Sequence, residues 1–166
     1  MLVAVDTNVL LDQAIGDGEV IEALGIIQKR LKDVRFVVTP TVLHELAWAV
    51  DNADEPETRE AALQALSHLQ EWGYQPLNVI PVGRGIVEQI GLKLRTLGIV
   101  PEEEQNDASI IAEAALIDCK ILLSSDWHLL EAQENPDFRQ TLRDFDVADV
   151  VIARPITIVT KFFSPK

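Results

Sequence analysis

The sequence predicts an α/β fold built on a central, mostly parallel sheet of about five strands. Several short aliphatic segments are apolar at consecutive positions, which is typical of strands that are buried on both faces of a parallel sheet. Between them lie longer segments whose apolar residues recur every three to four positions, the period of amphipathic helices. The two patterns alternate along 166 residues, a length typical of one domain.

Five segments are strand candidates. In chain order they are Leu2–Val5, Arg35–Val38, Leu77–Val82, Lys120–Leu123 and Val150–Val159. The first, second and fourth are the clearest, because each is short and aliphatic throughout. Pro155 interrupts the last one.

Five segments between the strands carry the helical period. They are Glu19–Leu31, Thr41–Val50, Glu57–Trp72, Gly85–Leu97 and Gln105–Ile117. The acidic stretch Asp51–Glu60 contains Pro56 and is expected to be an exposed loop. We therefore expect residues 1–166 to form a single domain, with a helical insert or extension around residues 51–82.

Charge and composition limit the possible functions. The chain has 14 Lys and Arg against 27 Asp and Glu, a formal net charge of −13, which repels polyanions unless bound cations or a local patch compensate. The single cysteine, Cys119, excludes an internal disulfide and a cysteine-based zinc cluster. There is no apolar run of about 18 residues and no basic leader at the N-terminus, so we expect a soluble cytoplasmic domain without a membrane partner.

Four carboxylates are expected to meet at one edge of the sheet. Asp6 and Asp126 follow two of the clear strands, and Glu45 lies on the helix that follows a third. Asp107 begins the helix that precedes the strand at 120–123 and therefore starts at the same edge. Clustered carboxylates repel one another, and oxygen-only ligands suit Mg²⁺ or Mn²⁺. We expect oxygens of Asp6, Asp107 and Asp126 to lie close enough to share one ion.

These residues carry a resemblance to a known family. The segments VAVDTNVLL (3–11), VVTPTVLHEL (37–46), NDASIIAEAAL (106–116) and ILLSSD (121–126) resemble the PIN-domain nucleases, especially the short VapC-type bacterial toxins. The resemblance implies a three-layer α/β/α fold and Mg²⁺- or Mn²⁺-dependent cleavage of RNA. It also implies a catalytic quartet of Asp6, Glu45, Asp107 and Asp126, and polar support from Asn8 and Ser124. The segment Ile156–Phe163 resembles the final strand and tail of the family.

The resemblance also implies partners. VapC-type toxins act in toxin–antitoxin pairs, so an antitoxin protein is a possible partner beside the RNA substrate, and the family often forms homodimers. Many relatives carry a further acidic residue two positions after the last Asp, where this chain has His128.

Other polar and aromatic residues receive simpler interpretations. The basic cluster Lys29, Arg30, Lys32 and Arg35 is expected at the edge opposite the carboxylates, because it precedes a strand. The three histidines, His44, His68 and His128, show no metal-ligand spacing and are interpreted as surface or capping residues. The three tryptophans, Trp48, Trp72 and Trp127, are expected to pack rather than to stack on bases.

The sequence thus favours a metal-dependent endoribonuclease in which Asp6, Asp107 and Asp126 hold the metal and Glu45 completes the shell or orients water. One alternative is a catalytically silent PIN-like module for protein interactions, which would suit the charge of −13. A phosphotransfer domain with an aspartyl nucleophile is disfavoured, since no Lys follows the clear strands closely.

Overall fold

The computed structural model describes residues 1–163 and contains a five-stranded sheet in which every pairing is parallel. The strand order is β3-β2-β1-β4-β5. The strands are β1 (Leu2–Val5), β2 (Arg35–Val38), β3 (Tyr74–Pro76), β4 (Ile121–Leu123) and β5 (Val151–Ala153). The predicted α/β class, the parallel sheet and the three clear strands are confirmed.

The strand order contains a topological switch. The chain first builds outward from β1 to β2 and β3, and then crosses back so that β4 pairs with the other side of β1. In open α/β sheets, ligands bind at such a point, outside the carboxyl ends of the strands. The loops that follow β1 and β4 are therefore the expected place for a ligand.

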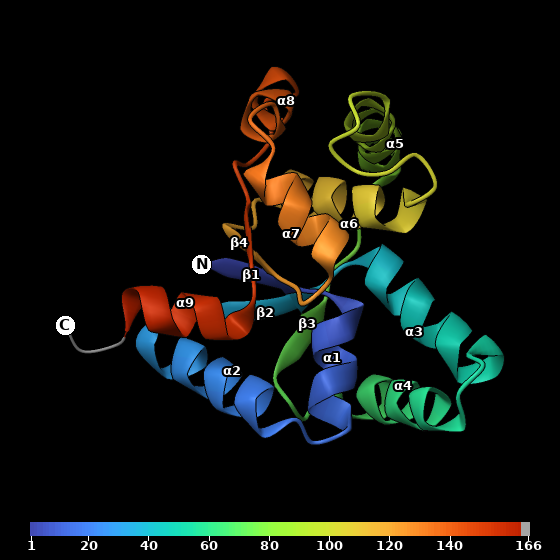
Figure 1. Ribbon diagram of the computed structural model, residues 1–166, viewed down its shortest axis with the longest axis vertical. Coiled ribbons are helices and arrows are strands. Elements are labelled where there is room, and N and C mark those ends of the chain that lie inside the picture. Colours follow the sequence, from blue (N-terminus) through green and yellow to red (C-terminus); the bar gives the residue numbers. More distant parts are fainter. Residues whose placement is uncertain (164–166) are drawn as a thin grey trace.

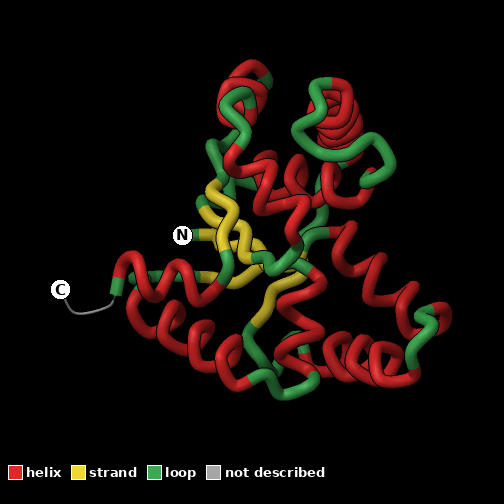
Figure 2. The backbone as a smooth tube through the Cα atoms, in the orientation of Figure 1, coloured by secondary structure: helices red, strands yellow, loops and turns green. Residues whose placement is uncertain are grey.

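Helices cover the sheet on both faces (Figures 1 and 2). The helices are α1 (Thr7–Ala14), α2 (Gly18–Arg30), α3 (Pro40–Asn52), α4 (Pro56–His68), α5 (Pro81–Thr96), α6 (Gln105–Leu116), α7 (Trp127–Glu134), α8 (Phe138–Asp144) and α9 (Pro155–Phe162). In Figure 1, α2 and α9 lie side by side below the sheet, while α6 and α7 lie above it. Within the described residues, no helix is long and apolar enough to cross a membrane.

The third strand lies outside the predicted segment. The prediction of a strand at Leu77–Val82 is wrong, because β3 ends at Pro76 and α5 begins at Pro81. The apolar side chains of Ile80 and Val82 are 72% and 73% exposed, so their pattern does not reflect burial. Tyr74 is the buried residue of β3, and its ring lies 5.7 Å from that of Phe36 on the neighbouring strand.

The C-terminal segment is mostly helical. Only Val151–Ala153 of the predicted strand Val150–Val159 pairs with β4, and the family-like strand and tail at Ile156–Phe163 is wrong. Pro155 explains the change, because proline has no N–H for the ladder and its fixed φ suits the first position of a helix. The resulting α9 buries Ile158 and packs against α2.

Proline also shortens the loop that was expected at Asp51–Glu60. Only residues 53–55 separate α3 from α4, because Pro56 starts α4 instead of breaking the helical run. Helix α4 packs against both α1 and α3. Helices α1, α7 and α8 are additional to those predicted; α1 and α7 begin directly after Asp6 and Asp126, which are their N-caps.

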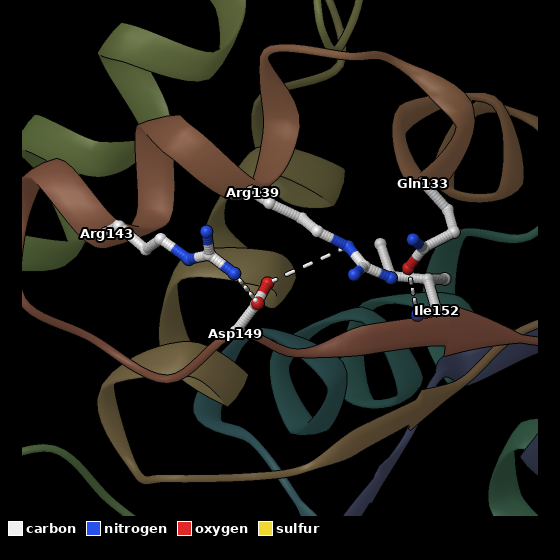
Figure 3. Close-up of polar contacts among 5 residues, drawn as sticks. All are labelled: Gln133, Arg139, Arg143, Asp149 and Ile152. Atoms are coloured by element: carbon white, nitrogen blue, oxygen red, sulfur yellow. Dashed lines mark hydrogen bonds and ion pairs between the residues drawn. The ribbon is translucent and has the colours of Figure 1, made fainter.

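Side chains secure the edge strand β5 (Figure 3). The side-chain oxygen of Gln133 on α7 accepts a hydrogen bond of 2.6 Å from the backbone N–H of Ile152. Just before β5, Asp149 pairs with Arg143 at 2.7 Å and with Arg139 at 3.9 Å, both on α8. The hydrogen bond satisfies one N–H on the free edge of the sheet, and the ion pairs fix the point at which the chain enters β5.

Candidate active site

The four predicted carboxylates line one cavity at the switch point. Asp6, Glu45, Asp107 and Asp126 all border a cavity of about 660 Å³ at the carboxyl edge of the sheet. They come from the ends of β1 and β4 and from the first half of α3 and the first turn of α6. The four carboxylates thus lie together at one edge of the sheet, as expected from the strand order. Their chemical roles are a proposal.

Asp6 is held in place before any ligand binds. Its side chain is only 3% exposed; one carboxylate oxygen accepts from the N–H of Thr7 at 2.7 Å, and the other accepts from the Ser124 hydroxyl at 2.7 Å. The pKa of Asp6 is raised to about 7, mainly by burial. The charges of Glu45 and Asp126 add to this rise, and the hydrogen bonds from Ser124 and Thr7 partly oppose it. The site therefore places a carboxylate where its negative charge is poorly compensated.

Asp126 is positioned by its neighbours on β4 and α1. Its backbone N–H donates to the Ser124 hydroxyl at 2.9 Å, and its side chain caps α7 by accepting from the N–H of His128 at 2.7 Å. The amide of Asn8 on α1 donates to its other carboxylate oxygen at 3.4 Å. Asn8 and Ser124, the two expected supports, thus contact Asp126 and Asp6 directly.

Asp107 has the least compensation. It lies in the first turn of α6, and no group of the described residues donates a hydrogen bond to its side chain. Burial is the main cause that raises its pKa to about 8, followed by the charges of Asp126, Asp6, Glu104 and Glu45. A cation in the cavity would relieve this repulsion.

Glu45 reaches the cavity from α3, and its carboxylate accepts a short hydrogen bond from the Thr7 hydroxyl. The start of α3 is fixed by Glu113 on α6, whose buried carboxylate accepts from the N–H of Thr41 at 3.0 Å and from its hydroxyl at 2.9 Å. Since Glu45 lies one turn after Thr41, this contact ties the placement of Glu45 to the helix that carries Asp107.

The cavity contains residues that the sequence did not single out. Glu104 contributes a fifth carboxylate, 3.6 Å from the imidazole of His128, and the other ring nitrogen of His128 is buried without a partner in the described residues. A signal for Glu104 existed in the sequence, since it stands three residues before Asp107 at the start of the same helix.

The aromatic interpretation needs one correction. Trp72 packs against the core as expected, but Trp48 and Trp127 are 56% and 57% exposed and line the cavity. Both follow a site carboxylate closely in the chain, so the elements that bring the carboxylates to the cavity bring the indoles as well.

The chemistry of the donors fits a hard divalent cation, but their spacing does not form a finished cage. All the candidate ligands are carboxylate oxygens, which Mg²⁺ and Mn²⁺ prefer. Within residues 1–163, however, no three Asp, Glu, His or Cys side chains form a ready-made group that could hold an ion, so the sharing of one ion by Asp6, Asp107 and Asp126 stays a prediction.

The basic cluster lies elsewhere. Lys29 and Arg30 end α2, and Arg35 begins β2 at the amino edge of the sheet. None of the four cluster residues lines the acidic cavity.

Comparison with known proteins identifies the family. The sequence model of the PIN domain matches residues 3–135, so the chain belongs to the PIN domain family, as the sequence motifs indicated. Comparison with curated proteins gave no significant match.

Two solved structures share the fold. A chain from the structure of VapBC2 from Rickettsia felis, bound to a DNA fragment from their promoter, is 12% identical over 93% of this chain and 98% of that chain, with a TM-score of 0.61. A chain from VapBC-1 of nontypeable Haemophilus influenzae is 15% identical over 94% of this chain and 99% of that chain, with a TM-score of 0.61. At these identities, the likeness concerns the fold.

Proposed function

We propose that this protein is a Mg²⁺- or Mn²⁺-dependent endoribonuclease and the toxin of a toxin–antitoxin pair. The observation that carries the proposal is the convergence of Asp6, Glu45, Asp107 and Asp126 on one cavity, with the pKa of both Asp6 and Asp107 raised. A site that concentrates uncompensated carboxylates at a switch point favours a bound cation, and a cation there admits a phosphate.

Each site residue has its own role in the proposed reaction. Asp6, Asp107 and Asp126 would hold the ion, which supplies Lewis-acid activation of the phosphodiester and of water. Ser124 and Asn8 orient the carboxylates of Asp6 and Asp126, and Thr7 orients Glu45. Glu45 accepts a hydrogen bond from the attacking water. Oxygen of that water bonds to phosphorus and the bond from phosphorus to the leaving ribose oxygen breaks. The attacking water gives up one proton to solvent, and the leaving ribose oxygen takes up one proton from solvent, so that a phosphate monoester and a hydroxyl group result.

The toxin role rests on the structural relatives. The two structures described above are of VapBC proteins, so we propose that a small antitoxin protein binds this chain and that the chain acts in the cytoplasm. A homodimer is also part of this proposal. Co-expression with any small open reading frame that precedes the gene, followed by affinity purification of this chain, should yield a stable complex of the two proteins.

A catalytically silent interaction module is the second candidate, and the net charge of −13 favours it because that charge opposes RNA binding. The two functions differ in what happens to RNA. We expect wild-type protein to cleave members of a panel of transfer, ribosomal and single-stranded RNAs in Mg²⁺ or Mn²⁺, and EDTA to stop the cleavage.

Two variants make this test specific. Asp107→Asn should slow cleavage by orders of magnitude without changing the circular dichroism spectrum, because one ligand charge is lost. Asp54→Asn makes the same chemical change on the exposed loop between α3 and α4 and should cleave like the wild type. Equal inactivity of wild type and Asp107→Asn across the panel would favour the interaction module.

A further inference from the structure

A second cavity meets the acidic one at Trp127. Its volume is about 690 Å³, and Trp127 and His128 line both cavities. The rest of its lining comes from Gly98, Ile99, Pro101 and Arg154, and from Leu130, Glu131, Glu134 and the C-cap Asn135 of α7. Because the two cavities share a wall, an extended chain bound at the carboxylates can continue into the second cavity.

Trp127 presents an indole face at this junction. It is the first residue of α7, directly after the N-cap Asp126, so the site carboxylate and the indole leave the same turn. The imidazole of His128 lies beside it, with ring centroids 3.7 Å apart and an angle of 34° between the planes. This neighbour restricts the indole, which is still 57% exposed. A restrained, exposed aromatic ring is a platform on which an unpaired base stacks.

Arg154 supplies the positive charge that the acidic cavity lacks. It follows β5 directly, and because all strands are parallel it lies at the same edge of the sheet as Asp6 and Asp126. Among the described residues, Arg154 is the one Lys or Arg that lines either of the two cavities, and it forms no ion pair with an acidic side chain. Glu131 and Glu134 line the same cavity, but neither forms an ion pair with Arg154, so its exposed guanidinium is available to a phosphate.

We propose that the second cavity binds the unpaired nucleotide next to the cleaved phosphodiester, with its base stacked on Trp127 and its phosphate at Arg154. This inference rests on the proposed nuclease function and adds to it a nucleotide subsite beside the carboxylates. A base inside a duplex keeps both faces against its neighbours in the stack and has no free face for Trp127.

Binding of a fluorescently labelled single-stranded oligoribonucleotide of eight nucleotides, followed by anisotropy in Mn²⁺, tests the aromatic contact. The measurement uses full-length protein that carries Asp107→Asn, so that cleavage does not interfere. Adding Trp127→Ala should weaken binding roughly 5- to 150-fold, the range for one stacked base, and Trp127→Phe should restore most of it. Phe162→Ala removes an exposed ring outside both cavities and should leave binding unchanged.

The salt dependence of the same binding tests the phosphate contact. Arg154→Ala should reduce the slope of log affinity against log salt by about 0.7, the value for one phosphate of a single strand. Arg154→Lys should keep the slope, and so should the matched control Arg84→Ala on the exposed start of α5. The oligonucleotide annealed to its complement should bind more weakly than the single strand.

Equal binding of single strand and duplex, no measurable binding of either, or undiminished binding after Trp127→Ala would overturn the subsite. These outcomes are separable from failure of the proposed function. If the wild type cleaves RNA but Trp127→Ala binds like its parent, the nuclease function is supported and the subsite is rejected. If the wild type does not cleave RNA but binding depends on Trp127 and Arg154, the nucleotide-binding site is supported and the nuclease function is rejected.

Discussion

At the scale of single residues, Ser124 is the connection between the two strands that meet at the switch point. Its hydroxyl donates to Asp6 after β1 and accepts from the backbone N–H of Asp126 after β4. The side chain is fully buried, so water does not replace either contact if the hydroxyl is removed. One oxygen atom therefore sets the positions of two site carboxylates.

Ser124→Ala should lower the free energy of unfolding by about 1–3 kcal/mol, because it leaves buried polar groups without partners. It should also raise the pKa of Asp6 further, since the hydrogen bond from Ser124 opposes the effect of burial. Urea denaturation measures the first effect. Ser125→Ala, which removes a weaker contact of 3.3 Å to Asp12 on a less buried residue, is the control; an equal loss in both variants would contradict this role.

The raised pKa values of Asp6 and Asp107 predict how stability depends on pH in EDTA. Unfolding returns both carboxyls to an ordinary pKa of 3.8, so between that value and about 8 the folded protein binds more protons than the unfolded one. Stability due to these groups is therefore greatest at low pH and falls as pH rises through this window. Asp107→Asn should flatten the fall in melting temperature between pH 5 and pH 8. Asp54→Asn should not, and a slope unchanged by Asp107→Asn would contradict the prediction.

At the scale of elements, α3 and α6 form one unit through Glu113. The buried carboxylate of Glu113 on α6 accepts two hydrogen bonds from Thr41 at the start of α3. Negative charge at a helix N-terminus also interacts favourably with the helix dipole. Since α3 carries Glu45 and α6 carries Asp107, this contact fixes the positions of these two site residues relative to each other.

Glu113→Ala should lower the free energy of unfolding by about 2–3 kcal/mol, the scale of a buried hydrogen bond to a charged group. It should also weaken RNA cleavage through displacement of α3, although Glu113 does not line the cavity. Glu131→Ala, on an exposed position of α7, is the control for stability. A Glu113→Ala protein as stable as that control would show that the contact between Glu113 and Thr41 contributes little to stability.

The elements also show where sequence reasoning succeeds and where it fails. The strands β1, β2 and β4 are central, buried on both faces and aliphatic, so their pattern leads directly to their structure. The edge elements are less constrained by burial. β3 is Tyr74–Pro76 with one buried residue, and the apolar residues after it are exposed. Pro56 and Pro155 start helices, and composition alone suggested that they interrupt elements.

At the scale of the whole molecule, parallel topology explains why the acidic site was predictable. Residues far apart in sequence, such as Asp6 and Asp126, meet because all strands point their carboxyl ends to one edge. The approach of Glu104 and Trp127 to the cavity depends on local loop and helix geometry, which strand order does not determine. How closely the carboxylate oxygens approach one another also depends on local side-chain geometry, which the spacing of residues in the sequence does not reveal.

The charge distribution gives the molecule one acidic edge. The carboxylates gather at the carboxyl end of the sheet, while Lys29, Arg30 and Arg35 lie toward the amino end. With a net charge of −13, approach of a phosphodiester to the acidic cavity is opposed unless positive charge is added there. We therefore expect these carboxylates to bind a divalent cation.

The shift of the melting temperature on adding Mn²⁺ to EDTA-treated protein tests this claim most directly. An ion at a hundredfold excess over its dissociation constant adds about 2.7 kcal/mol, which corresponds to a rise of roughly 5–10 °C for a chain of this size. We expect that rise in the wild type and in Asp54→Asn, and its near absence in Asp6→Asn relative to the variant's own baseline in EDTA. An equal rise in Asp6→Asn and wild type would show that the ion does not bind at these carboxylates.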